Sequence, residues 1–428
     1  MKRILRRIHD HWFAPASLQD LAIVRIAVVG FELLILLWPW LARGAGICHA
    51  CNLDYTLLLA DFPDGQFLAI PTLKVLMLPF GEWGVRPEPM FLTAVWMLAV
   101  VSGLGALVGL YSKLSLLVFA ATTTLLNAHG YSYGEAHHTE AALMIGLWLL
   151  AFSPAGARLS VDDYLRRLDR VRATGQFEPR TWSDDQSELA RWPLRTGQWV
   201  LAITYLSAGI AKIVNGGWAW LNGYTLANHV GLDAIRHGRP VGLWAAQQVW
   251  LLRAMSVFTV GFELLFVLAV LVPGVAWLFV LTGLAMHGGI YVLQAAPFFQ
   301  TMVLYIVFIE PVRNALAKVW LPKPRGRLAV IYDGRSPTAQ RSMLLLETVD
   351  LRHALSYLDI HTDSQEIQRR AGSLEPDVPA VYVVDAAGRM YGGWPGFRRL
   401  ARSLPLLWPL LPLVYLAGVV RATDPTPA

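Results

Sequence analysis

Long apolar runs, separated by polar breaks of a few to about fifty residues, occur along the first three quarters of the chain. A helix that crosses a bilayer needs about 20 mostly apolar residues, and most runs reach or approach that length, whereas those at 140–152 and 298–309 are shorter but strongly apolar. The pattern therefore predicts about eight crossings. We place them at 18–41, 90–110, 114–129, 140–152, 196–214, 255–272, 275–293 and 298–309.

Basic residues indicate which loops face the cytoplasm. Four Lys and Arg lie within the first seven positions, eight Arg lie in 158–195, and five Lys and Arg lie in 313–327. Cytoplasmic loops carry an excess of Lys and Arg, and these segments follow zero, four and eight predicted crossings. We therefore expect a multi-pass protein of a bacterial-type inner (plasma) membrane, with its N-terminus and C-terminal domain in the cytoplasm. Because the first run is long and carries Arg25 and Glu32, we interpret it as an uncleaved helix.

Composition supports a membrane protein. Hydrophobic residues make up 55% of the 428 residues and charged residues 15%, whereas soluble domains are about a quarter charged, so disordered and most soluble classes are excluded. The net charge of +6 does not indicate nucleic acid, because the basic residues stand at the ends of apolar runs. We expect membrane lipid around the chain and no nucleic-acid partner. Two cysteines exclude a disulfide scaffold.

The pattern changes after the last predicted crossing. A basic linker at 313–327 leads into 328–403, where short apolar segments alternate with helical ones, which predicts a small α/β unit. Three prolines near the start of 404–428 would break a spanning helix, so we expect that tail to be membrane-associated. The predicted fold is thus an all-α polytopic membrane bundle over 1–312 followed by a small α/β domain. Strands are expected at 328–333, 357–360 and 380–385, and helices at 338–349 and 364–371.

Ionisable side chains inside apolar runs are the main candidates for chemistry, because their burial in hydrocarbon is costly. The predicted topology places Lys212, His287, His137 and His138 in the same outer leaflet. A lysine in a dry pocket loses the solvation that favours its ammonium, so the free amine becomes a usable base, and nearby histidines can donate to a developing oxyanion. Glu263 is a candidate partner for one of the cations. The alternative is that Lys212 extends to the interface and that His287 is a hydrogen-bonded residue of the bundle interior.

Other polar residues are weaker candidates. Arg25 and Glu32 are interpreted as pairing with other helices, and His229 as a surface residue of an outer segment. Cys48 and Cys51 have redox spacing, but a local disulfide or unpaired thiols are favoured over a redox centre. The sequence holds no zinc signature, phosphate loop or nucleophile elbow, so no metal is predicted.

Several motifs occur in an order that is typical of one family. They are Pro15-Ala-Ser-Leu18, Gly109-Leu-Tyr-Ser-Lys-Leu-Ser115, Ala208-Gly-Ile-Ala-Lys212 and Trp220-Leu-Asn-Gly-Tyr224. Over roughly residues 10–312 the chain resembles the membrane half of vitamin K-dependent γ-carboxylase and its bacterial relatives, the HTTM family.

The resemblance implies a reduced naphthoquinone, a vitamin K-like hydroquinone, as cofactor, with Lys212 as the base that deprotonates it. It also implies catalytic roles for His287 and for His137 or His138, since counting from different motifs selects either one. Trp220, Tyr224 and Glu263 are candidates for contacting the cofactor.

The C-terminal region resembles a second family. Val330-Ile-Tyr-Asp-Gly334 and Val383-Val-Asp385 are similar to the DCC family of thioredoxin-like oxidoreductases, and Pro379 fits the thioredoxin-type proline. Ser336 and Ala339 occupy the positions of that family's two cysteines. Because thiol exchange needs thiolates, we expect a domain without redox activity that serves docking or stability.

Together these features predict quinol-dependent proton abstraction or carboxylation in an outer-leaflet pocket, by an enzyme resembling a lyase. The substrate would be a secreted peptide or a small lipophilic molecule. The alternative is a non-catalytic membrane factor for the maturation, export or immunity of a secreted peptide.

Overall fold

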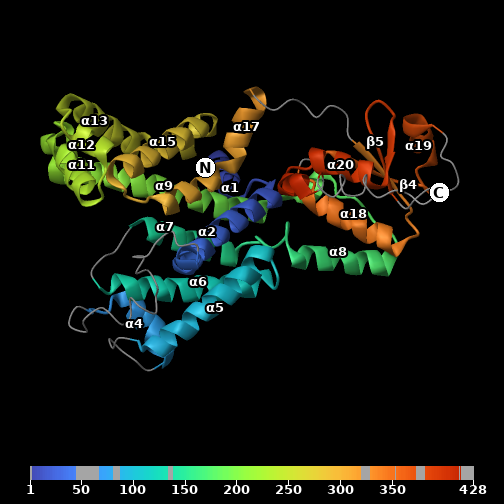
Figure 1. The fold of residues 1–428 in the computed structure, drawn as a ribbon, viewed down its shortest axis with the longest axis horizontal. Helices are drawn as coiled ribbons and strands as arrows, with labels where there is room; N and C mark the ends of the chain where they lie inside the picture. Colours follow the sequence, from blue (N-terminus) through green and yellow to red (C-terminus); the bar gives the residue numbers. More distant parts are fainter. Residues whose placement is uncertain are drawn as a thin grey trace. The chain divides into compact units, whose positions relative to one another are not determined.

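A computed structural model describes residues 2–44, 67–80, 87–133, 138–319, 328–351, 353–372, 381–413 and 415 (Figure 1). The described residues are mainly helical, and they form two compact units. The first unit comprises Met1–Ala155 and Gln186–Val319, and the second comprises Gly156–Asp185 and Trp320–Ala428.

The first unit is built from helices and one short strand pair. Its first half contains α1 (Lys2–Phe13), β1 (Ala16–Ser17), α2 (Leu18–Gly44), α4 (Pro71–Met77), η2 (Leu78–Phe80), α5 (Pro89–Val108), α6 (Ser112–Tyr131) and α7 (His138–Phe152). Its second half contains β2 (Gln186–Ser187), α9 (Glu188–Ala211), η4 (Lys212–Gly216), α10 (Trp218–Leu221), α11 (Tyr224–Arg236), α12 (Pro240–Ala246), α13 (Val249–Leu265), α14 (Leu268–Leu271), η5 (Pro273–Val275), α15 (Ala276–Gln294), α16 (Phe299–Leu304), η6 (Tyr305–Phe308) and α17 (Ile309–Val319).

The strand pair holds the beginnings of two long helices together. Ala16 pairs with Ser187 and Ser17 with Gln186 in antiparallel register, directly before α2 and α9. The Ser187 hydroxyl then accepts a hydrogen bond from the Leu189 amide at 3.2 Å and caps α9. The two helices therefore begin side by side.

Several described helices are long and apolar enough to cross a membrane. Four pass this test, namely Leu18–Trp38, Pro89–Val108, Glu188–Gly216 and Pro273–Gln294. A fifth crossing results if Pro240–Ala246 and Val249–Leu265, which meet at 94°, form one broken span. These helices are consistent with the predicted membrane protein, but they are fewer than the eight crossings that the apolar runs predicted.

The lower number has local causes. The run at 114–129 folds as α6, which includes Thr122, Thr123, Thr124 and Asn127 in its second half. The run at 140–152 gives an apolar helix of fewer than 18 residues, and the run at 298–309 is divided between α16, η6 and the start of α17. Apolar content alone overestimated how many runs form continuous spanning helices.

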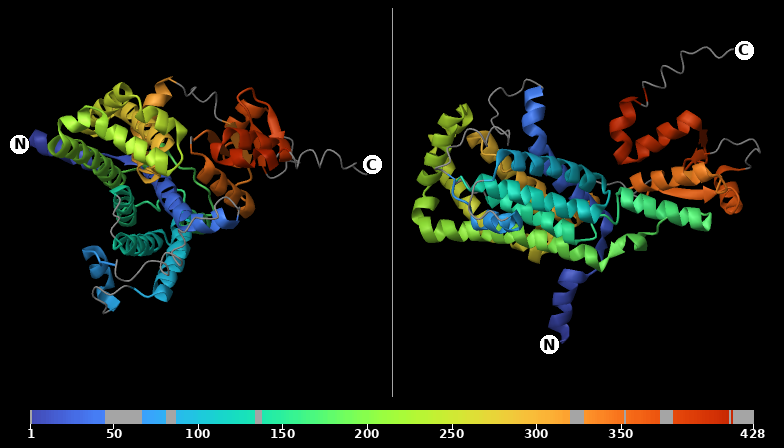
Figure 2. Two further views of the ribbon diagram at one scale, coloured as in Figure 1. Left: turned by 60° about the vertical axis from the view of Figure 1, so that its left-hand side comes forward. Right: turned by 90° about the horizontal axis from the view of Figure 1, so that it is seen from below.

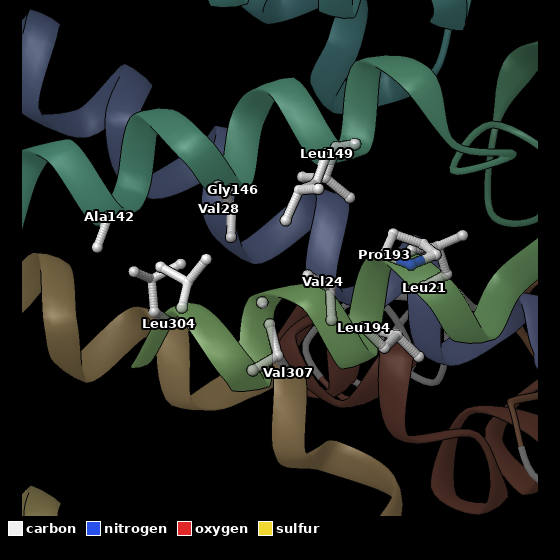
Figure 3. Close-up of a pocket in the computed structure, with 13 residues that line it drawn as sticks. Leu21, Val24, Val28, Ala142, Gly146, Leu149, Pro193, Leu194, Leu304 and Val307 are labelled. Carbon is white, nitrogen blue, oxygen red and sulfur yellow. The ribbon is translucent and has the colours of Figure 1, made fainter. Parts of the chain in front are cut away.

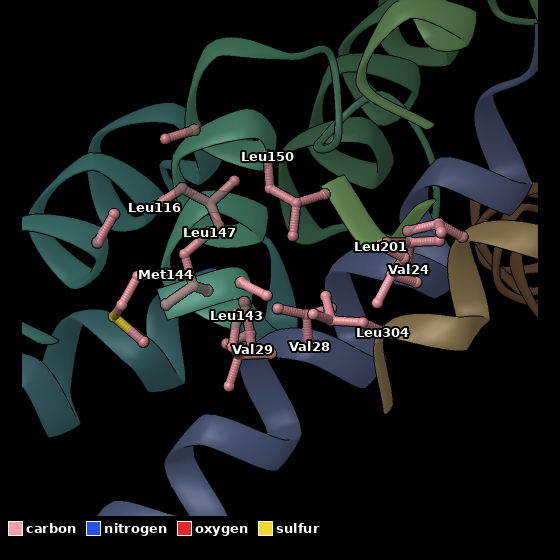
Figure 4. Packing of buried hydrophobic residues seen from close by; sticks show 14 of the residues in the cluster. Val24, Val28, Val29, Leu116, Leu143, Met144, Leu147, Leu150, Leu201 and Leu304 are labelled. Atoms are coloured by element: carbon pink, nitrogen blue, oxygen red, sulfur yellow. The ribbon is translucent and has the colours of Figure 1, made fainter. Parts of the chain in front are cut away.

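The apolar core of the first unit lies where α2, α6, α7 and α9 meet. Figure 4 shows Val28 of α2, Leu116 of α6, and Leu143 and Leu147 of α7 among its side chains. A neighbouring cavity between α2, α7, α9 and α16 has a volume of only about 20 Å³ and an apolar lining (Figure 3). It is large enough for about one water molecule, so we exclude it as a ligand site.

The second unit contains a four-stranded mixed sheet of order β4-β3-β5-β6. β3 pairs in parallel with β4 and antiparallel with β5, and β5 pairs antiparallel with β6. The sheet thus confirms a small strand-containing region near the C-terminus. The elements are α8 (Val161–Thr174), η3 (Trp182–Asp185), β3 (Leu328–Tyr332), α18 (Pro337–Val349), β4 (Leu355–Asp359), α19 (Ser364–Ala371), β5 (Val381–Val384), β6 (Met390–Gly392), α20 (Gly393–Ser403) and η7 (Pro405–Leu410).

The side chains of β3 point alternately to the two faces of the sheet, and each face packs against a different set of helices. Val330 and Tyr332 pack with α18 and α20, whereas Ala329 and Ile331 pack with Ile367 of α19 on the other face of the sheet. β6 and α20 were not expected from the sequence. Leu404, at the start of the predicted membrane-associated tail, is fully buried with the side chains of the first face, and 416–428 lies outside the described residues.

Segment 156–185 also belongs to this unit, although it was predicted to be part of the membrane bundle. α8 lies beside α18 (Figure 1 and Figure 2), and Phe177 contacts the rings of Tyr332 and Tyr357 edge-on. Arg167 donates to Glu347, whose other oxygen accepts from the Arg180 amide. Burial lowers the pKa of Arg167 and raises the pKa of Tyr332 to about 12. Ion pairing and aromatic packing thus fix a segment whose basic composition predicted only a cytoplasmic location.

Candidate functional site

The end of α9 presents two functional side chains on one face. Tyr205 and Lys212 are seven residues apart, which is two helical turns, so their side chains lie on the same side of the helix. Lys212 begins the π-helical turn η4, and the chain then reverses at Gly217 with a φ of 49°. Single π-helical turns are rare and occur frequently at functional sites.

Lys212 forms an ion pair with Glu263 of α13. Its Nζ lies 2.7 Å from Oε1 and 2.9 Å from Oε2, and the two side chains are 21% and 8% exposed. Gly209 allows this approach, because a Cβ there would lie 3.1 Å from the Glu263 Cβ and from Leu264. The predicted partner role of Glu263 is therefore present, and Lys212 is not an isolated amine.

Trp220 of α10 covers the lysine. The Lys212 Nζ lies 5.3 Å from the centroid of the Trp220 ring, within the range of a cation–π interaction. Gly216 leaves room for that ring, since a Cβ at this position would lie 2.1 Å from Trp220 Cδ1. The His229 ring of α11 stacks on Trp220 with centroids 6.1 Å apart. The lysine head is thus held between a carboxylate and an aromatic face.

His287 of α15 belongs to a buried hydrogen-bonded chain. Its Nε2 lies 2.6 Å from the Tyr205 hydroxyl, which lies 2.5 Å from the Tyr305 hydroxyl of η6. All three side chains are buried, and Phe262 and Phe266 pack around Tyr205. These hydrogen bonds restrict the orientation of the imidazole ring of His287.

Most of these groups line one cavity of about 750 Å³, within the range of ligand pockets of about 300–1,000 Å³. Its polar lining residues include Tyr205, Lys212, Trp220, His229, Glu263 and His287. Its remaining lining includes apolar side chains such as Phe258, Met286 and Ile290. The site therefore combines an apolar wall with a few convergent polar groups.

The other predicted site residues lie elsewhere or outside the description. Tyr224 is 61% exposed and is not part of the cavity lining. His137 lies outside the described residues, as do Cys48 and Cys51, and the same applies to the side chain of His138 at the start of α7. Within the described part of the chain, no group of three or more His, Cys, Asp and Glu side chains is arranged to hold a metal ion.

The weaker candidates have local roles. Arg25 is fully buried in α2 and donates to the Ala155 carbonyl at 2.8 Å, and Glu32 is also buried. Neither residue lines the 750 Å³ cavity.

Three residues of the site were missed in the sequence. Tyr205 had a usable signal, since it precedes Lys212 by two turns in an apolar run. His229 is exposed, as its predicted surface position requires, but its contact with Trp220 was not expected. Tyr305 had none, because only tertiary packing brings η6 against α9 and α15. Comparison of the chain with known proteins adds no assignment: no protein-family model, curated protein or solved structure matches it.

Proposed function

We propose that the cavity at the end of α9 binds a lipophilic hydroquinone and that the Lys212–Glu263 pair accepts a hydroxyl proton from it. The observation that carries this proposal is the convergence of the ion pair and the His287–Tyr205 hydrogen bond on one cavity. The Glu263 carboxylate beside Lys212 can hold a proton. The imidazole of His287, which lies in another helix and is fixed by Tyr205, provides a second polar group in the same cavity.

The residues of the cavity fit a hydroquinone. A flat bicyclic ring requires apolar walls, which Phe258 and Met286 supply, and an aromatic face for stacking, which Trp220 supplies. Its hydroxyl groups require hydrogen-bond partners, one of which Lys212 supplies, and the His287–Tyr205 pair adds polar lining. When bound, a hydroquinone supplies two electrons and two protons to an acceptor such as dioxygen.

The roles of the protein groups follow from their contacts. Lys212 must release a proton before its amine can accept one, and the Glu263 carboxylate at 2.7 Å is the acceptor within reach. We assign the pair, rather than the lysine alone, as the base. Tyr205 is a positioning residue, because it contacts His287 and orients the ring that faces the ligand.

The family resemblance extends this proposal to proton abstraction from a substrate, with carboxylation as one outcome. We propose an HTTM-like protein with an outer-leaflet pocket in a plasma membrane, which acts on a small lipophilic molecule or a secreted peptide. Eight crossings would require the helices that fall short in length or apolarity to span as well.

The C-terminal sheet supports the proposed DCC-like, thioredoxin-type domain. A parallel β3–β4 pair joined by α18, followed by antiparallel β5 and β6, is the strand arrangement expected of such a fold. The Ser336 hydroxyl accepts from the Ala339 amide at 3.3 Å and caps α18, so the position of the family's first thiol has a structural use here. A docking or stabilising role fits this arrangement.

One observation favours the non-catalytic alternative. Glu263 already neutralises the charge of Lys212. An ion pair between two helices can have the sole role of holding those helices together. In that case the cavity would bind a lipophilic partner without reaction, as a factor for peptide maturation, export or immunity would.

A measurement of turnover distinguishes the enzyme from the non-catalytic factor. Purified wild type and Lys212→Ala are incubated with a reduced naphthoquinone and oxygen, and formation of quinone or epoxide is followed. The enzyme proposal expects a wild-type rate above the buffer background that Lys212→Ala loses. Equal rates for both proteins, at background, would remove the enzyme and leave the binding role.

A further inference from the structure

A second polar cavity lies at the other end of α9. It has a volume of about 310 Å³, and it is lined by Arg191, Arg195 and Gln198 of α9, by the Pro273–Gly274 turn and by the start of α17, including Glu310. Arg195 and Lys212 are 17 positions apart along the sequence, which corresponds to about 25 Å along a helix. The two cavities are therefore separate sites.

The two arginines of this cavity differ in how their charges are compensated. Arg191 donates to the Ala14 and Pro15 carbonyls at 2.8 and 2.9 Å, and it pairs with Glu310 at 3.6 Å. Arg195 donates to the Gln198 side-chain oxygen at 2.8 Å and to the Val270 carbonyl at 3.5 Å. Within the described residues, Arg195 forms no ion pair, and its buried Nε has no hydrogen-bond partner. The cavity thus contains two guanidinium groups and one carboxylate, Glu310, among those residues, which leaves an excess of one positive charge.

The position of the cavity indicates what compensates this charge. It lies where α9 and α15 begin, both of which belong to helices long and apolar enough to span a membrane, and such ends lie near lipid headgroups. Basic pockets between helices on the cytoplasmic side bind the headgroups of acidic lipids, and guanidinium is well suited to phosphate oxygens. The positive-inside pattern assigns this end to the cytoplasm.

We propose that this cavity binds the phosphate group of an acidic phospholipid, with Arg195 as the main contact. Glu310 sets the strength of binding, since its carboxylate competes for the same cationic environment. Binding through a headgroup would anchor the α9, α15 and α17 ends to the inner leaflet. This inference does not depend on the chemistry of the Lys212 cavity.

Lipid binding to the full chain tests the proposal. The delipidated protein in non-ionic detergent is titrated with phosphatidylglycerol, with phosphatidylcholine of the same acyl chains, or with inorganic phosphate, and bound adducts are quantified by native mass spectrometry. Wild type is expected to prefer phosphatidylglycerol by about tenfold, the effect of one charge-assisted hydrogen bond. Arg195→Gln should lose this preference, and Arg195→Lys should retain part of it.

Two further variants test the proposal even if Arg195→Gln does not fold. Glu310→Gln should bind phosphatidylglycerol more tightly than wild type, because a competing negative charge is removed. Arg236→Gln, an exposed arginine of α11 outside this cavity, should bind like wild type.

Equal affinity for the two lipids in wild type, or an unchanged preference in both Arg195→Gln and Glu310→Gln, would overturn the proposal. Arg195-dependent binding of inorganic phosphate without any preference for phosphatidylglycerol would keep the phosphate chemistry and overturn the lipid as its source.

Discussion

Gly283 leaves the space that the Tyr305 hydroxyl occupies. A Cβ at Gly283 would lie 2.0 Å from that oxygen and 2.6 Å from Tyr305 Cζ. The missing side chain in α15 therefore allows the hydrogen bond between Tyr305 and Tyr205, and through it the orientation of His287. A residue without any functional group thus determines the geometry of the site.

Substitution of this glycine tests that dependence. Gly283→Ala should lower the free energy of unfolding by about 1–3 kcal/mol, the usual cost of overpacking a core, and it should weaken ligand binding in the cavity. Thermal or chemical unfolding in detergent measures the first effect. The matched control is Gly289→Ala in the same helix, where a Cβ would meet nothing within 4 Å. If both variants behave alike, the steric account is wrong.

The Lys212–Glu263 pair should show strong coupling. Lys212→Met leaves a buried carboxylate without its partner and should cost about 3 kcal/mol of unfolding free energy. The double variant Lys212→Met/Glu263→Leu should recover most of this loss, because both charges are then absent. A double-mutant cycle measures the coupling, and additive losses would argue against a buried ion pair.

The packing of segment 156–185 against the C-terminal sheet can be tested at Phe177. This ring is 6% exposed and contacts Tyr332, Tyr357 and the Arg167 guanidinium. Phe177→Ala should destabilise the second unit by about 3–5 kcal/mol. Limited proteolysis of the full chain should then cleave that unit faster. Leu345→Ala, at a position of α18 that is 55% exposed, is the control and should leave the cleavage rate unchanged.

His11 gives the first unit a pH dependence. Burial, together with the positive charges of Arg195 and Arg191, lowers the pKa of His11 below its ordinary 6.5, and its Nε2 accepts the Trp199 indole N–H at 3.0 Å. Near pH 6 the unfolded chain therefore binds more protons at His11 than the folded chain does, so this contribution to stability decreases as the pH falls below 6.5.

The melting temperature should accordingly fall between pH 7.5 and 5.5, and it should fall less in His11→Gln, whose amide oxygen can still accept from Trp199. Melting curves of both proteins at the two pH values provide the comparison. An identical decrease in both would assign the effect to other groups.

Part of this structure could be predicted from residues alone. Apolar runs locate the helices because hydrocarbon excludes unpaired backbone groups, and Lys212, Glu263 and His287 are conspicuous as ionisable residues within such runs. Their helix positions place them toward one end of the bundle, which is where the cavity lies. The sequence pattern also predicted β3, α18 and β5 of the C-terminal unit, because buried strands and amphipathic helices have different periods.

Other features depend on contacts between distant segments. The basic segment 158–195 was predicted only to be cytoplasmic, and the contacts of Arg167 and Arg180 with Glu347 show that 156–185 is folded into the C-terminal unit. The position of Tyr305 depends on the absence of a side chain at Gly283, which no local pattern indicates. The number of spanning helices was overestimated in part because the hydropathy of a run does not show where the run is divided into short helices, as 298–309 is divided between α16, η6 and α17.

Ligand binding by variants that fill the cavity tests the central claim most directly. Ala208 lines the cavity, whereas Ser207, the preceding residue of α9, is exposed and lies outside the lining. Naphthoquinone binding to wild type, Ala208→Phe and Ser207→Phe in detergent can be measured by isothermal titration calorimetry. The account predicts saturable binding to wild type and Ser207→Phe and at least tenfold weaker binding to Ala208→Phe, a cost of about 1.4 kcal/mol or more. Equal binding by all three proteins, or no saturable binding to wild type, would contradict it.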